Sequence, residues 1–154
     1  MPKLLKFLLL VVLLNVARYV LGAPLEMVVI FKPLFGVMSA NSSYFNTDFK
    51  AFDWATSFFY NFMMWLTAEW VFVLLAPVLE GNWYVKSLKV YALMALFFMS
   101  VSCIYMNHYT HPKTFYFWNL VDAAMVFPLV GLVNGFLYPR LMDHRRVANV
   151  AAST

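Results

Sequence analysis

The stretch NFMMWLTAEWVFVLLAP, residues 61–77, decides the fold class of this chain. It is apolar enough to lie in lipid, yet it carries Glu69 near its middle. An ionised side chain at the bilayer centre costs about 2.5–3.5 kcal/mol on insertion scales, so a carboxyl group there needs a partner or a function. The stretch therefore predicts a membrane-spanning helix whose acidic side chain faces other protein groups rather than lipid.

The composition extends this prediction to the whole chain. Of its 154 residues, 64% are hydrophobic and 12% are charged, whereas a soluble domain is about 45–50% apolar and about 25% charged. We therefore expect one integral membrane domain surrounded by membrane lipids. The net charge of +4 comes without a basic run interleaved with aromatic residues, so nucleic-acid binding is not predicted. Cys103 is the single cysteine, which excludes an intrachain disulfide.

Four segments are long enough to cross the hydrocarbon core as helices, which takes about 20 residues. We predict an all-α, four-transmembrane-helix bundle with spans at residues 4–21, 54–79, 88–109 and 115–138. Helix breakers separate them: Gly22-Ala-Pro24 ends the first, Gly81-Asn82 follows the second, His111-Pro112 precedes the fourth, and Pro139 stops it.

Residues 25–52 are apolar and aromatic but are interrupted by Lys32-Pro33. This segment is too short and broken to span, so we expect an interfacial or re-entrant segment on the outer side. Asn41, in Asn41-Ser42-Ser43, is a glycosylation acceptor if the host and compartment allow it.

The positive charges predict the orientation. Lys3 and Lys6 precede the first apolar run, which could be a signal peptide but which we interpret as a retained helix. Arg18, near its end, can then extend to the interface. With four spans, seven Lys and Arg residues lie on the side of both termini and four on the other. The positive-inside rule places both termini, including the tail 140–154, in the cytoplasm.

Small residues predict close helix packing. Gly131-x-x-x-Gly135 has the spacing that lets two helix backbones approach. Ser100, Cys103 and Asn107 form a small, polar stripe on one face of the third span. Both features favour a packed bundle, although either could equally mark contact with another subunit.

The polar residues within the spans are expected to converge on the bundle interior. Helix geometry predicts a shallow cluster near the outer side, made of Asn61, Asn107, Asn119 and Asp122, and a deeper carboxyl group, Glu69, with Asn134 also deep. One hypothesis is a ligand pocket or proton path around Glu69 and Asp122. The other, which we favour slightly, is a protonated Glu69 that donates one hydrogen bond between helices.

Metal and catalytic signals are weak. His108 and His111 lie three residues apart without a third ligand nearby, so we predict no metal site. No histidine lies deep in a span to hold haem, and no other cofactor is indicated. Phosphate-loop, nucleophile-elbow and zinc-protease motifs are absent from the sequence.

The chain resembles the emopamil-binding and sigma-2 receptor family, the EXPERA domain, mainly over residues 1–95. The resemblance rests on four spans, an aromatic first outer loop, Glu69-Trp-Val-Phe72 followed by Pro77, and a short loop bearing Lys86 and Lys89. It implies that Glu26 and Glu69 line a pocket for a sterol or a cationic amphiphile. The second span lacks the histidine of the sterol isomerases, so the resemblance favours ligand binding over isomerase activity, which stays an open alternative.

Two functions follow from these patterns. The favoured hypothesis is a non-catalytic accessory or structural subunit of a larger membrane complex, because the surface is apolar and rich in adaptable Met and Phe. The alternative is a lipid- or sterol-binding protein of the EXPERA type. Its candidate ligand-binding residues are Glu26, Glu69, Asp122, Asn119, Asn134 and Asn107.

Overall fold

The computed structural model describes residues 2–46 and 48–142, and over these residues the chain forms helices and no strands. Four helical stretches are long and apolar enough to cross a membrane: Lys3–Val29, α4 (Ala51–Leu75), α5 (Trp83–His108) and α6 (Lys113–Leu141). The predicted all-α, four-helix architecture is confirmed, and the chain is a multi-pass membrane protein. The part of the predicted tail beyond Met142 lies outside the described residues.

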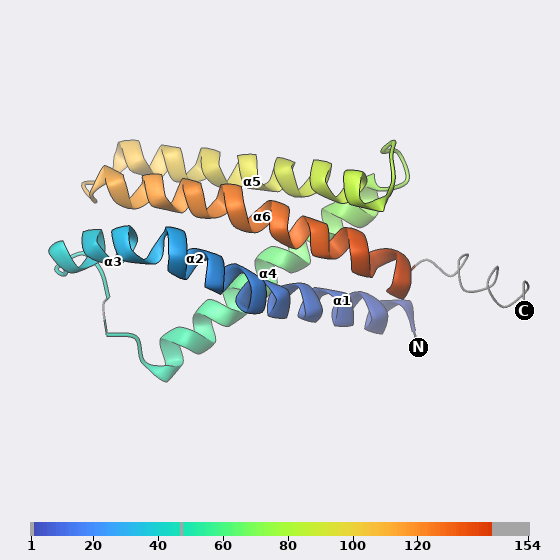
Figure 1. Cartoon of the computed structure of the whole chain (residues 1–154), viewed down its shortest axis with the longest axis horizontal. Coiled ribbons are helices and arrows are strands. Elements are labelled where there is room, and N and C mark those ends of the chain that lie inside the picture. Colours follow the sequence, from blue (N-terminus) through green and yellow to red (C-terminus); the bar gives the residue numbers. More distant parts are fainter. Residues whose placement is uncertain (1, 47, 143–154) are drawn as a thin grey trace, which may run out of the picture.

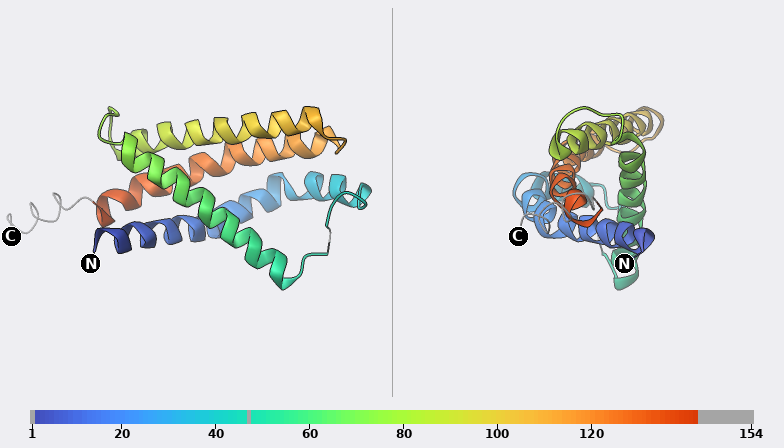
Figure 2. Two further views of the ribbon diagram at one scale, coloured as in Figure 1. Left: turned by 180° about the vertical axis from the view of Figure 1, so that it is seen from behind. Right: turned by 90° about the vertical axis from the view of Figure 1, so that its right-hand side faces the viewer.

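The helices run roughly along one long axis, except α4 (Figure 1). Helices α5 and α6 form an antiparallel pair, and the first helical stretch lies along α6. Helix α4 crosses the others obliquely, as the view from behind shows, and its N-terminal end projects away from the bundle (Figure 2). Near its N-terminal half α4 contacts the first helical stretch, where Phe58 stacks on Tyr19 with ring centroids 5.6 Å apart, and this placement of α4 shapes the site described below.

The first helical stretch does not end at Gly22-Ala-Pro24, so this prediction is wrong. Helix α1 (Lys3–Ala17) continues through a π-helical turn, η1 (Arg18–Gly22), into α2 (Ala23–Val29). A proline inside an α-helix lacks an N–H and clashes with the preceding turn. Here Pro24 lies in the first turn of α2 and follows the wider π turn, so the rod continues.

The segment predicted to be interfacial or re-entrant is largely helical. Helix α3 (Phe31–Ala40) follows α2 after Ile30 and extends the rod towards the turn between α5 and α6 (Figure 1). The aromatic residues after it cover that turn: the ring centroids of Phe45 and Phe115 lie 4.5 Å apart, and Phe45 also contacts His111. The position of this segment relative to a bilayer stays a prediction.

The other helix ends follow their sequence signals closely. Gly81 has a φ of 110°, which favours glycine, and the Asn82 side chain caps α5 by accepting a hydrogen bond from the Val85 N–H at 3.0 Å. His111-Pro112 separates α5 from α6. Pro139, in contrast, does not stop α6, which runs on to Leu141.

The α5–α6 pair packs through the predicted glycine motif. A Cβ atom added to Gly135 would lie 2.7 Å from the Tyr84 Cα, and one added to Gly131 would lie 3.0 Å from the Tyr91 Cβ. Glycine is therefore required for this backbone approach, and the motif serves contact within the chain. The Ser100, Cys103 and Asn107 stripe does not pack in the core, because Ser100 and Asn107 are exposed and the Ser100 hydroxyl bonds to its own helix.

Candidate functional site

The polar residues of the spans lie in two separate places. The first is a closed cluster around Glu69, which is completely buried on α4. The Tyr91 hydroxyl of α5 donates a hydrogen bond to the Glu69 Oε2 at 3.2 Å, and Asn134 of α6 is close enough to interact with the same carboxyl group. Glu69 therefore faces protein groups, as the sequence predicts, and it connects three helices.

Asn134 extends this cluster along α6. Its Nδ2 donates to the Ser87 Oγ at 3.2 Å, and the Ser87 hydroxyl donates to the Gly131 carbonyl at 2.7 Å. Asn134 and Ser87 are completely buried. The chain of hydrogen bonds thus joins the Glu69 environment to the glycine-mediated contact of α5 and α6, which is the arrangement of a structural polar core.

The second place is an ion pair across the π turn. The Arg18 guanidinium contacts both carboxyl oxygens of Glu26, with Nη2 2.6 Å from Oε1 and Nη1 3.0 Å from Oε2. On an unbroken α-helix these residues, eight apart, would differ by about 80° in direction. A π turn advances each residue by a smaller angle than an α turn, so η1 reduces this offset and brings the two groups together.

Asp122 of α6 lies beside this pair. Its carboxyl group interacts with both Glu26 and Arg18. Among the described residues, the buried Asp122 Oδ1 has no hydrogen-bond partner. The Asp122 and Glu26 carboxyl groups therefore interact with each other beside one guanidinium, which makes its ion pair with Glu26.

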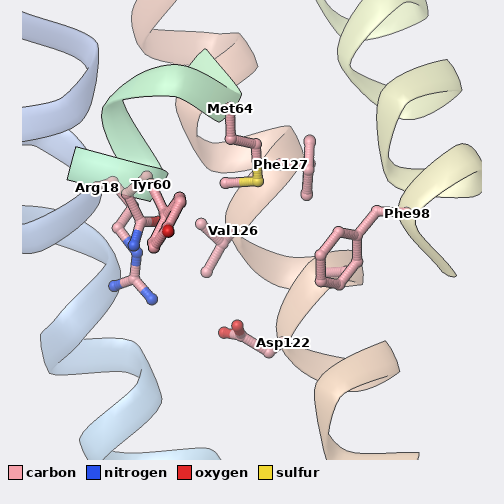
Figure 3. Close-up of a pocket in the computed structure, with 9 residues that line it drawn as sticks. Arg18, Tyr60, Met64, Phe98, Asp122, Val126 and Phe127 are labelled. Carbon is pink, nitrogen blue, oxygen red and sulfur yellow. The ribbon is translucent and has the colours of Figure 1, made fainter. Parts of the chain in front are cut away.

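A cavity of about 490 Å³ opens next to Arg18 and Asp122. Figure 3 shows the Arg18 guanidinium and the Asp122 carboxyl group directed towards the same space, with Phe98 and Phe127 beyond them. The cavity is lined by η1, α4, α5 and α6 through Arg18, Tyr60, Asn61, Met64, Phe98, Asp122, Ala123, Val126 and Phe127. Its volume falls within the range of small-molecule sites, about 300–1,000 Å³. It has a charged end and an apolar end, which suits an amphiphilic ligand.

The structure divides the predicted ligand-binding residues between these two places. Asp122 lines the cavity and Glu26 supports it, whereas Glu69 and Asn134 belong to the closed cluster. The Trp65 side chain lies between the cavity and the closed cluster. Its ring stacks on Tyr91 of the cluster and contacts the Phe127 ring of the cavity edge-on.

Asn119 and Asn107 belong to neither place. The Asn119 side chain donates to the Phe115 carbonyl of its own helix at 2.9 Å, and Asn107 is exposed. Asn61 does line the cavity, and its Nδ2 donates to the Tyr19 hydroxyl at 3.3 Å. The predicted shallow cluster of four residues is thus reduced to Asn61 and Asp122.

Sequence reasoning missed Arg18 as a site residue. It predicts that Arg18 extends to the interface, but only 15% of its side chain is exposed. The spacing of Arg18 and Glu26 gave no signal, because eight residues of regular α-helix would leave the two side chains about 80° apart and only the π turn brings them together. The apolar lining from α4 and α5 had no sequence signal, because it depends on how α4 crosses the bundle.

His111, in the turn after α5, lies among aromatic side chains. The His111 Nδ1 lies 3.2 Å from the Tyr116 hydroxyl, and its ring packs against Tyr44 and Tyr109. Within the described part of the chain, no group of three or more His, Cys, Asp or Glu side chains could hold a metal ion. No family model, curated protein or solved structure matches this chain.

Proposed function

We propose that this protein binds an amphiphile with a cationic or hydrogen-bond-donating head group inside the membrane. The observation that carries the proposal is the cavity of about 490 Å³ with Arg18 and Asp122 at one end and Phe98 and Phe127 at the other (Figure 3). A pocket with a few polar groups in an apolar wall fixes the orientation of a ligand that has both characters.

The charges at the polar end favour a donor on the ligand. Arg18 uses two nitrogens on Glu26, and Asp122 remains as a second carboxyl group with an unpartnered oxygen among the described residues. A protonated amine or a hydroxyl group placed there would supply the missing donor. An ammonium group would also balance the second carboxylate, and charge-assisted hydrogen bonds of this kind are roughly twice as strong as neutral ones.

Binding of dodecylamine to the purified protein in lipid nanodiscs tests this proposal. Asp122→Asn removes the charge at nearly constant shape, and we expect it to weaken binding at least tenfold, which corresponds to about 1.4 kcal/mol. Glu69→Gln is the matched control, because it makes the same change outside the cavity, and it should leave the affinity unchanged. Unchanged binding in Asp122→Asn, or an equal loss in both variants, would refute the proposal.

A second candidate is the accessory subunit of a larger membrane complex. It is favoured by the N-terminal end of α4, which projects from the bundle (Figure 2) and exposes Phe52, Trp54 and Phe59 to their surroundings. Exposed aromatic clusters of this kind suit contact with another protein. Extraction in mild detergent followed by native sizing should then show a species much larger than one 17.9 kDa chain. A single chain alone in its micelle would count against this candidate.

A further inference from the structure

An apolar groove continues from the cavity into the space between α4 and α5. It has a volume of about 220 Å³ and is lined by Met64, Thr67, Met94, Phe97, Phe98, Val101 and Phe127. Three of these residues, Met64, Phe98 and Phe127, also line the cavity. The two spaces therefore share a wall, and Phe97, with 66% of its surface exposed, marks the open side of the groove.

The groove lies deeper along the helices than the charged end of the cavity. Along α4 the cavity is lined by Tyr60, Asn61 and Met64, and the groove by Met64 and Thr67, one turn further on. On α5 the groove residues 94, 97, 98 and 101 follow one helix face over about 10 Å. An amphiphile with its head group at Asp122 would therefore direct its chain along this face.

We infer that the groove between α4 and α5 holds a single hydrocarbon chain of the bound amphiphile, so that the ligand is a single-chain amine or alcohol lying along the bundle. This inference rests on the proposed function. The lining suits one flexible chain: it is apolar apart from the Thr67 hydroxyl, which bonds to the Met63 carbonyl of its own helix at 3.0 Å. Met64 and Met94 add side chains that adapt to irregular shapes.

The groove fixes the position of the hydrocarbon chain and adds little hydrophobic free energy to binding. Lipid tails are as apolar as the groove, so moving a chain from the bilayer into it gains no transfer free energy. The groove instead provides a place for the chain that is compatible with the head group at Asp122. Blocking it should therefore weaken binding of a long-chain ligand by a steric effect and leave a short-chain ligand unaffected.

Photolabelling tests where the chain lies. The probe is dodecylamine with a diazirine at the far end of its chain, added to the whole protein in lipid nanodiscs. We expect most labelling of the protein on residues 94–101 of α5 and 64–67 of α4, and competition by unmodified dodecylamine. Labelling spread evenly over the lipid-facing surface would overturn the inference.

A pair of α5 variants tests the groove by affinity. Val101→Trp fills the groove, whereas Leu96→Trp adds the same side chain at an exposed position outside it. We expect Val101→Trp to weaken dodecylamine binding about tenfold and to leave butylamine binding unchanged. Leu96→Trp should change the affinity for neither ligand. If Asp122→Asn weakens dodecylamine binding and Val101→Trp does not, the inference about the groove is wrong and the proposed function stands. If Asp122→Asn has no effect on binding, the proposed function itself fails. If Val101→Trp does not fold, the photolabelling pattern of the unsubstituted protein decides whether the groove holds the hydrocarbon chain.

Discussion

Glu69 shows how one acidic residue is accommodated inside a membrane helix. It is completely buried, it accepts a hydrogen bond from Tyr91, and it lies beside Asn134, so no lipid reaches it. The sequence predicts that this side chain faces protein, because the alternative in lipid is too costly. The neighbours themselves could not be predicted, because helix periodicity gives a direction for a side chain and not the residue it meets on another helix.

The Tyr91 hydroxyl should contribute measurably to stability. Removing it with Tyr91→Phe deletes the 3.2 Å hydrogen bond to Glu69 and keeps the stacking on Trp65. Interhelical hydrogen bonds in membranes average about 0.6 kcal/mol and reach about 1.7 kcal/mol, so we expect a loss in this range. Denaturation in detergent micelles measures it, with Tyr105→Phe, at an exposed position of the same helix, as the control. Equal stability of both variants would show that the hydroxyl contributes nothing.

Hydropathy and turn residues predict the existence of the four long helices well, but they predict the ends of these helices less well. Length and apolar character are sufficient to identify a span, and Gly81-Asn82 and His111-Pro112 mark true ends. Pro24 does not, because a proline in the first turn of a helix, after a widened turn, is compatible with helical structure. Pro139 does not either, since α6 continues past it to Leu141. The ion pair of Arg18 and Glu26 depends on that widened turn, and so the polar end of the cavity was not predicted.

The close approach of α5 and α6 at Gly135 can be tested by substitution. Gly135→Ala would place a methyl group 2.7 Å from the Tyr84 backbone, so the helices must separate. We expect a destabilisation of about 1–3 kcal/mol. Gly36→Ala on α3 is the control: its methyl group would meet nothing within 4 Å, and alanine favours a helix by roughly 0.5–1 kcal/mol. If the two variants unfold alike in micelles, the close approach at Gly135 is wrong.

For the whole molecule, the helix arrangement supports a testable orientation. The N-terminal end of α1 and the turn between α4 and α5 lie at one end of the bundle, and the turn between α5 and α6 lies at the other (Figures 1 and 2). Positive charges predict that the first of these ends is cytoplasmic. Which helix ends lie together follows from the number of spans, because each span brings the chain to the opposite end of the bundle. The oblique crossing of α4 comes from tertiary packing, which local sequence patterns do not predict.

Cysteine labelling tests the orientation in intact cells. In a Cys103→Ser background, Lys113→Cys lies at the predicted outer end and Glu80→Cys at the predicted inner end. A membrane-impermeant maleimide should label the first variant in intact cells and the second only after permeabilisation. The opposite pattern would invert the orientation while leaving the fold unchanged.

The polar residues of the spans form one accessible cavity beside Asp122 and one closed cluster around Glu69. Cysteine reactivity measures this difference directly. In the Cys103→Ser background, Ala123→Cys lines the cavity and Ala68→Cys lies in the closed core, although only 3% and 0% of these alanines are exposed. We predict that a small methanethiosulfonate reagent modifies the cysteine at 123 much faster than that at 68, and that dodecylamine slows only the reaction at 123. Equal rates at the two positions would show that the cavity is no more accessible than the closed cluster, and no protection by dodecylamine would show that the ligand does not occupy the cavity.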